Sequence, residues 1–121
     1  MAKTILIVDD SAVVRQVVSY SLSKAGYEVI AAVDGNDALT KLPNPSITMV
    51  ITDLNMPGMN GIELIRQLRT RREFKFTPIV MLTTISEESK KHEGKEAGAS
   101  GWIFKPFTSS QLMDVVKRFI A

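Results

Sequence analysis

Five short apolar runs, each followed by polar or turn-forming residues, divide the chain at fairly even intervals. They cover residues 4–8, 28–33, 49–53, 79–82 and 102–104. Their length and their content of Val, Ile, Leu and Phe predict strands, because helices need longer periodic segments. The first run is continuously apolar, which predicts a strand buried on both faces, whereas the second alternates and should be less completely buried.

The segments between and after these runs carry helix signals. Capping residues and helical spacing predict helices at about residues 12–25, 36–41, 62–68, 87–97 and 109–120. Ser11 and Ser86 are the expected N-caps of the first and fourth helices. In the first helix the recurring apolar positions are Val13, Val14, Val17, Val18 and Leu22. The fourth helix should be marginal or mobile, because residues 89–96 hold only charged or small side chains and His92.

Five strands alternating with five helices through short connections predict an α/β fold. Right-handed crossovers then make the chain a doubly wound, five-stranded parallel sheet. A length of 121 residues suits one domain, so we expect a single (βα)5 domain over residues 1–121, without an output domain. The flavodoxin-like strand order 2-1-3-4-5, known for this class of sheet, would place the first and third strands side by side.

Composition excludes several classes of function. The chain has 15 basic and 13 acidic residues, a net charge of +2, which is not by itself a nucleic-acid-binding signature. It has no cysteine, and no apolar run approaches a membrane span or signal peptide. We therefore expect a cytoplasmic protein that binds neither nucleic acid nor membrane. We interpret the densest basic run as a solvated helix end and the loop after it: Arg66, Arg69, Arg71, Arg72 and Lys75.

Polar side chains follow four of the predicted strands. Asp9 and Asp10 come directly after the first, Asp53 ends the third, Thr83 follows the fourth and Lys105 follows the fifth. Ligands of open α/β sheets bind outside the carboxyl ends of the strands, so these side chains should converge at one edge. For Asp9, Asp10, Thr83 or Lys105 taken alone, a structural role such as capping of the next helix is the better explanation, but it does not explain the set as a whole.

Three clustered carboxylates call for a cation. Two carboxylates about 4 Å apart repel by roughly 4 kcal/mol at an effective dielectric of 20. Oxygen ligands from Asp10, Asp53 and a backbone carbonyl suit Mg²⁺, and Lys105 adds positive charge at the same edge. This combination favours phosphoryl transfer, with Asp53 as the nucleophile that forms an aspartyl phosphate and Thr83 as a hydrogen-bond donor to a phosphoryl oxygen.

Five motifs together characterise the chain: Ile7-Val8-Asp9-Asp10-Ser11, Asp53-Leu54-Asn55-Met56-Pro57-Gly58-Met59-Asn60-Gly61, Thr83-Thr84, Ala97-Gly98-Ala99 and Lys105-Pro106-Phe107. With them, essentially the whole chain resembles the receiver domain of bacterial two-component response regulators. Further short matches in residues 81–84, 94–95 and 101–103 resemble stand-alone chemotaxis-type, CheY-like regulators.

The resemblance implies roles for the residues of the site. Asp53 would accept phosphate from a histidine kinase or phosphotransfer protein. Asp10 and Asp53 would bind Mg²⁺, for which Mn²⁺ can substitute, together with the carbonyl of Asn55, while Asp9 would support the metal through water. Thr83 and Lys105 would contact the phosphoryl group, and a cis peptide bond before Pro106 would aim Lys105 into the site.

The resemblance also implies a switch and an output. Trp102 occupies the position of the family's switch aromatic, usually Tyr or Phe, and without a switch role it would simply be a partly buried aromatic beside the fourth helix. Asn55 and Ile85 flank the phosphorylation site, and the apolar Ile85 predicts slow self-dephosphorylation. Phosphorylation would alter the face made by helix 4, strand 5 and helix 5. The target would be another protein, such as the flagellar motor switch, and the first helix would dock the kinase.

Three alternative interpretations of the sequence are weighed against the residues present. A phosphatase of the haloacid dehalogenase class would need an acid two residues after Asp53, where Asn55 stands. A flavodoxin-like electron carrier would need a Ser/Thr-rich phosphate loop, where Asp9 and Asp10 stand. A third alternative is a receiver fragment of a larger regulator or hybrid kinase, although the start at Met1 and the end after the last helix favour a single-domain protein. We expect a non-enzymatic signalling protein that is monomeric, with phosphorylation-dependent dimerisation as the alternative.

Overall fold

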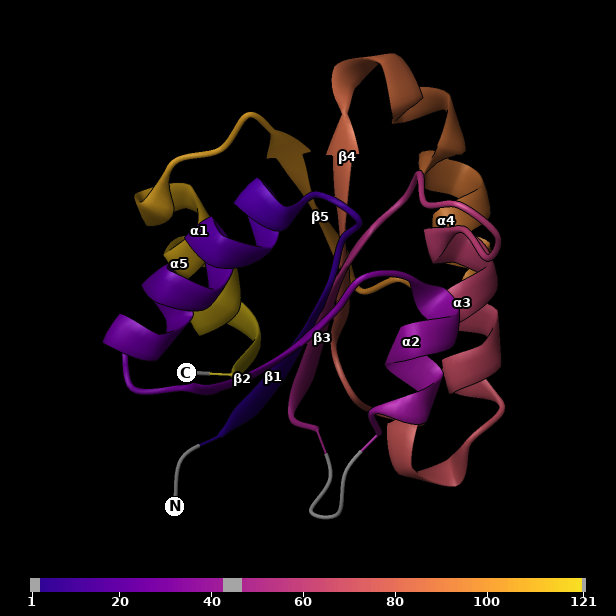
Figure 1. The fold of residues 1–121 in the computed structure, drawn as a ribbon. Helices are drawn as coiled ribbons and strands as arrows, with labels where there is room; N and C mark the ends of the chain where they lie inside the picture. Colours follow the sequence, from indigo (N-terminus) through magenta and orange to yellow (C-terminus); the bar gives the residue numbers. More distant parts are fainter. Residues whose placement is uncertain (1–2, 43–46, 121) are drawn as a thin grey trace.

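Parallel strands form the centre of the protein (Figure 1). The computed structural model describes residues 3–42 and 47–120. Its sheet has the order β2-β1-β3-β4-β5, so the predicted fold class and strand order are confirmed. The strands are β1 (Thr4–Val8), β2 (Glu28–Ala32), β3 (Met49–Asp53), β4 (Ile79–Thr84) and β5 (Gly101–Lys105).

Helices cover both faces of the sheet. The α-helices are α1 (Ala12–Lys24), α2 (Gly35–Thr40), α3 (Gly61–Arg69), α4 (Lys91–Ala97) and α5 (Ser109–Ile120), and two 3-10 helices are η1 (Arg72–Phe74) and η2 (Ile85–Lys90). In Figure 1, α1 and α5 lie on one face while α2, α3 and α4 lie on the other. No helix in the described part of the chain has the length and apolar character needed to cross a membrane.

Alternate residues of each central strand enter different cores. Leu6 and Val8 of β1 pack into the core beneath α2, α3 and α4. Ile5 and Ile7 pack into the core beneath α1 and α5. Because both faces are covered, the strand is apolar throughout, and this explains the continuous pattern in residues 4–8.

The start of the fourth helical segment differs from the sequence prediction. Strand β4 continues to Thr84, because Thr83 and Thr84 pair with Phe104 and Lys105. Thr84, not Ser86, is the N-cap, and Glu87 completes a capping box by accepting the Thr84 backbone N–H at 2.8 Å. The segment then begins as the 3-10 helix η2 and becomes α-helical only at Lys91.

One member of the basic run is a structural residue. The Arg69 guanidinium donates to the carbonyls of Gly98 at 2.8 Å, of Thr77 at 2.8 Å and of Phe74. The Gly98 and Phe74 carbonyls lie where α4 and η1 end, and the Thr77 carbonyl lies just before β4. No helix or strand therefore supplies their hydrogen-bond donors. The prediction of a solvated helix end is therefore wrong for Arg69.

The apolar positions of α1 divide into two groups. Val18 and Leu22 are fully buried and Val14 packs against the same core. Val13 and Val17 are exposed, together with Tyr20. The recurring valines therefore do not all face the sheet.

Candidate functional site

The three predicted carboxylates meet at the carboxyl edge of the sheet. Strands β1 and β3 are neighbours with Val8 paired to Thr52, so Asp9 and Asp53 follow at the same level. Oxygens of Asp9, Asp10 and Asp53 all lie within 4.8 Å of one another. Asp9 and Asp53 are buried, whereas Asp10 is exposed. The cluster therefore has a closed base and one side open to solvent.

Glycine at position 61 permits the packing beside Asp53. A Cβ atom on Gly61 would lie 2.3 Å from the Asp53 carbonyl oxygen and 3.0 Å from the Leu54 Cα. The Gly61 N–H instead donates to the Leu54 carbonyl at 2.8 Å. Asn60 and Glu63 form a capping box at the same point, which begins α3 directly against the end of β3.

Lys105 joins the two buried carboxylates. Its Nζ donates to Asp53 Oδ1 at 2.9 Å and to Asp9 Oδ2 at 3.2 Å. Burial opposes the charge of this ammonium group, but the hydrogen bonds and negative charges of Asp53 and Asp9 outweigh it and raise the pKa of Lys105. The lysine is therefore a fixed cation. The peptide bond between Lys105 and Pro106 is cis.

The carboxyl group of Asp53 is electrostatically strained. Burial is the main cause that raises its pKa to about 6, and the negative charge of Asp9 acts in the same direction. The hydrogen bonds from Lys105 and the Leu54 N–H oppose this rise only in part. At neutral pH the group is still mainly ionised and can act as a nucleophile. Further positive charge would relieve the strain, as a divalent cation does.

Thr83 contributes a buried hydroxyl without a partner. It lies on β4, one residue beyond Leu82, which pairs with Asp53. The residue is 1% exposed, and Oγ1 has no hydrogen-bond partner among the described residues. An unpaired buried polar group costs roughly 1–3 kcal/mol. Together with the oxygen donors of the carboxylates, this orphaned hydroxyl fits a site built for a metal ion and a phosphoryl group.

Asn55 lies at the rim of the site and contacts a residue that the sequence reasoning missed. Its side-chain amide donates to the Glu87 carboxylate, which also caps the Thr84 backbone. Glu87 therefore connects the loop after β3 to the loop after β4. The signal that would have revealed it is the Thr84-x-x-Glu87 spacing of a capping box. The Ile85 side chain lies outside the described part of the structure.

Trp102 lies outside the acidic cluster and near α4. It pairs with Met81 in the sheet and packs against the core beneath α2, α3 and α4. Gly94 leaves room for the neighbouring Met81 rather than for the indole, because a Cβ there would lie 2.9 Å from Met81 Sδ but at an ordinary contact distance of 3.6 Å from Trp102 Cζ2. The indole Nε1 is buried and has no partner among the described residues.

A lysine that the sequence reasoning also missed covers this aromatic region. Lys91 Nζ lies 5.7 Å from the centre of the Trp102 ring and 4.8 Å from that of Phe104, within cation–π range.

His92, on the same helix, has a side chain that is 85% exposed and lies 3.4 Å from Glu96. The structure therefore brings Asp9, Asp10, Asp53 and Lys105 together and leaves Trp102 and His92 outside the cluster.

Comparisons with known proteins agree with this geometry. Residues 5–117 match the response regulator receiver domain. The crystal structure of chemotaxis response regulator CheY4 of Vibrio cholerae is similar with a TM-score of 0.93 and 44% identity, covering 99% of this chain and 100% of that one. A response regulator from Chloroflexus aurantiacus has a TM-score of 0.91 and 36% identity, with 98% of each chain covered.

A third solved structure extends the likeness beyond stand-alone regulators. The receiver domain of NtrX from Brucella abortus has a TM-score of 0.88 and 27% identity, covering 96% of this chain and 97% of that one. The match to the receiver domain and the high identity over the full length of a CheY protein lead to one conclusion. The chain belongs to the response regulator receiver domain family and is a CheY-like receiver.

Proposed function

We propose that the chain is a phospho-accepting signalling module in which Asp53 takes a phosphoryl group from a histidine kinase or phosphotransfer protein. The observation that carries the proposal is the buried Asp53 carboxylate, held within 4.8 Å of the other two acids and bonded by Lys105 at 2.9 Å. This arrangement gives a nucleophile, a fixed cation and an excess of negative charge at one point. These are the requirements of metal-assisted phosphoryl transfer.

The donors at this edge fit Mg²⁺. Asp10 and Asp53 would hold the ion with the backbone carbonyl of Asn55, and Asp9 would support it through water. Mn²⁺ suits the same hard oxygen ligands. When bound, the ion neutralises carboxylate charge and polarises the phosphoryl oxygens. The raised pKa of Asp53 and the cluster of three acids, of which Lys105 contacts two, support this assignment.

The transfer makes one bond and breaks one. A carboxylate oxygen of Asp53 attacks phosphorus while the bond between phosphorus and the donor's nitrogen breaks, and that nitrogen keeps the electron pair. Lys105 lies beside the attacking carboxylate and can follow the charge from the carboxylate to a phosphoryl oxygen. The Thr83 hydroxyl, which has no hydrogen-bond partner among the described residues, can donate to another phosphoryl oxygen. Water later releases phosphate, so the chain catalyses only its own phosphorylation and dephosphorylation and is not an enzyme with a separate substrate.

Phosphorylation then acts on a partner through a shift of populations. The added charge favours one arrangement of Thr83, the η2 segment and Trp102, and so changes the face formed by α4, β5 and α5. The pairing of β4 with β5 supports this route. Thr83 pairs with Phe104, and Met81, two residues earlier on β4, pairs with Trp102. The exposed Val13 and Val17 of α1 offer a second surface, suited to docking of the kinase.

The likeness to a chemotaxis regulator suggests the pathway. The target would be the flagellar motor switch or another protein, reached in the cytoplasm without contact to nucleic acid or membrane. Residues 1–121 would act as one receiver domain and as a monomer, with a phosphorylation-dependent dimer as the alternative. A receiver cut from a larger regulator would have the same chemistry, whereas a phosphatase is disfavoured because the Asn55 amide cannot serve as a general acid.

The test is the intact-protein mass after incubation with acetyl phosphate, with and without Mg²⁺. We expect wild-type protein to gain one phosphoryl group only with the metal, and Asp53→Ala to gain none. Ser23→Ala, at an exposed residue of α1, serves as the control and should react like wild type. A gain that persists in Asp53→Ala, or no gain in wild type, would overturn the proposal.

A further inference from the structure

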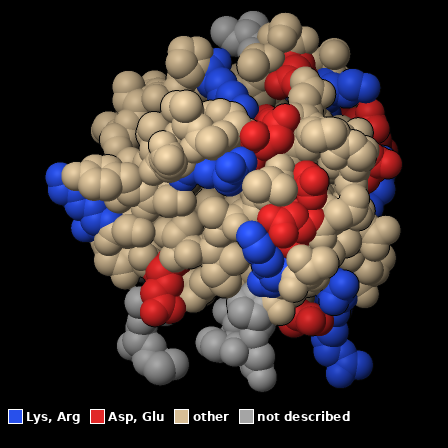
Figure 2. All heavy atoms as spheres, viewed as in Figure 1, with Lys and Arg blue, Asp and Glu red and all other residues tan. Residues whose placement is uncertain are grey.

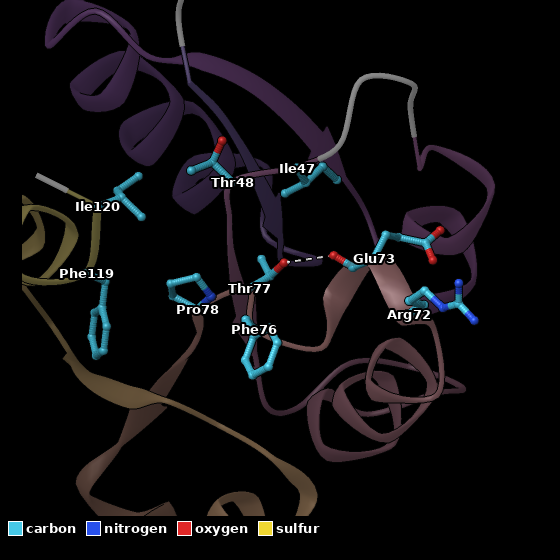
Figure 3. Close-up of a pocket in the computed structure, with 9 residues that line it drawn as sticks. All are labelled: Ile47, Thr48, Arg72, Glu73, Phe76, Thr77, Pro78, Phe119 and Ile120. Carbon is cyan, nitrogen blue, oxygen red and sulfur yellow. Dashed lines mark hydrogen bonds between the residues drawn. The ribbon is translucent and has the colours of Figure 1, made fainter.

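An apolar groove lies at the amino edge of the sheet, at the opposite end from the acidic cluster. It has a volume of about 480 Å³ and lies between the approaches to β3 and β4 and the end of α5. Its apolar lining consists of Ile47, Phe76, Pro78, Phe119 and Ile120. Figure 3 shows Phe119 and Pro78 on one side, Arg72 and Glu73 on the other, and Phe76 between them. We call this site the Phe76 groove.

Phe76 is exposed although the chain around it is firmly held. The residue is 89% exposed. The neighbouring Phe74 is buried in the core, and the carbonyls of Phe74 and Thr77 both accept from Arg69. Thr77 also donates its hydroxyl to the Glu73 carbonyl at 3.3 Å. The ring is therefore presented to solvent by a fixed turn. A single exposed aromatic is common, but here it borders a concave apolar surface.

The rim of the Phe76 groove is basic. Arg71, Arg72 and Lys75 are exposed in the turn, where Glu73 is the one acidic residue. In Figure 2, Lys and Arg side chains project at the lower right, below the turn that follows α3 in Figure 1. Lys117 and Arg118 in the last turn of α5 do not line the groove, and the helix dipole accounts for them. It does not account for the three cations beyond the end of α3, of which Arg72 lines the groove and Lys75 Nζ lies 5.5 Å from the centre of the Phe76 ring.

We propose that the Phe76 groove binds an acidic peptide segment of a partner protein. One aromatic or large aliphatic side chain would enter the groove beside Phe76 and Phe119, and flanking carboxylates would pair with Arg72 and Lys75. Arginine beside an exposed aromatic is typical of residues that dominate binding energy. The concave shape and the presence of Glu73 favour a peptide over a flat anionic membrane. The groove shares only the end of α5 with the face formed by α4, β5 and α5, and it lies at the opposite edge of the sheet from Asp53, so binding here is independent of phosphorylation.

The test is selection of random peptides displayed on phage against immobilised wild-type protein, with removal of phage that also bind Phe76→Ser. We expect enriched peptides that place Asp or Glu beside an aromatic or large aliphatic residue. Binding of the synthesised peptides should fall at least about tenfold with Phe76→Ser and with Arg72→Glu. Tyr20→Ser, at another exposed aromatic ring, is the matched control and should bind like wild type. Asp53→Ala should also bind like wild type, which separates this proposal from the phosphorylation chemistry.

Three results would overturn the proposal. One is the absence of any enrichment that depends on Phe76. Another is enrichment of peptides without acidic residues. The third is binding of wild-type protein to phosphatidylserine vesicles that Phe76→Ser abolishes, because this would assign the groove to a membrane surface. As a check on location, amide NMR shifts of Ile47 and Phe119 should move on addition of the selected peptide, and unchanged shifts would contradict the assignment.

Discussion

The two edges of the sheet differ in what they bury and what they expose. At the carboxyl edge, Asp9, Asp53 and Thr83 are polar groups buried away from water. At the amino edge, Phe76 is an apolar ring almost fully in water. Either arrangement costs stability, since burial of a charge and exposure of an aromatic are both unfavourable. The two costs indicate different kinds of site: buried charge fits the chemistry proposed for Asp53, and exposed apolar surface fits the binding proposed for Phe76.

The two edges also differ in how they are held together. At the carboxyl edge Lys105 joins two acids that repel one another, so its strongest contacts are charged. At the amino edge Arg69 joins neutral carbonyls that need a donor. We therefore expect substitutions at the first edge to change reactivity most, and substitutions at the second to change stability most.

The largest effect should come from Lys105→Met. Removal of the cation between Asp9 and Asp53 leaves the charge on a transferring phosphoryl group without its fixed partner. Loss of one such stabilising group slows a reaction by about 100- to 1,000-fold. The measurement is the rate of Asp53 phosphorylation by acetyl phosphate at saturating Mg²⁺. Lys90→Met, at an exposed lysine, is the control, and a Lys105→Met rate within a fewfold of wild type would contradict the role of Lys105.

Arg69→Met should reduce stability rather than reactivity. It leaves the carbonyls of Gly98 and Thr77 without their donor, so we expect the free energy of unfolding to fall by about 2 to 3 kcal/mol. Arg66→Met on the same helix is the matched control. Its exposed guanidinium lies 3.9 Å from Glu93, so a change of under about 0.5 kcal/mol is expected. Urea unfolding measures both, and equal losses would remove the distinction between the two arginines.

Asp53→Asn should make the metal-free protein more stable at neutral pH. The pKa of Asp53 is raised to about 6 in the folded chain, above its ordinary value of 3.8, so the unfolded chain releases this proton first as the pH rises. The fold therefore loses stability between about pH 4 and 6, and the loss stays constant above about pH 6. We expect the variant to gain about 2 kcal/mol at about pH 7.5 and little at about pH 4.

Urea unfolding in EDTA at the two pH values tests this sign. Asp114→Asn, at an exposed acid on α5, is the control and should show no such difference between the two values. Addition of Mg²⁺ should reduce the advantage of Asp53→Asn, because the ion binds the wild-type carboxylates. A variant that is less stable than wild type at neutral pH would show that Asp53 is not strained.

The smallest effect should come from Lys91→Met. The ammonium group near the rings of Trp102 and Phe104 contributes about 0.5 to 1 kcal/mol at a partly exposed site. Trp102 is the only tryptophan, so intrinsic fluorescence reports on it alone. We expect greater quenching of Trp102 by acrylamide in Lys91→Met, while Lys90→Met remains like wild type. Identical quenching in all three proteins would show that Lys91 does not hold the indole.

Local patterns in the sequence predicted most of the fold and of the candidate site. Strand runs are short and apolar because both faces are covered, and this signal placed β1 and β5 to within a residue at each end. The polar residues after the strands predicted the convergence of Asp9, Asp10, Asp53 and Lys105, since the carboxyl ends of parallel strands share one edge. Family resemblance, rather than spacing, added Asn55 and Trp102.

Hydrophobic periodicity and the residues at each strand end were enough to predict the order of elements, the sheet class and the residues of the candidate site. Which long polar side chain meets which distant backbone or ring follows only from the fold in three dimensions. Arg69 reaches Gly98, Glu87 reaches Asn55, and Lys91 covers Phe104 through contacts between segments far apart in the chain or on separate elements. A flexible cation or carboxylate looks the same in a sequence whether it is solvated or engaged, because its partner is chosen by packing.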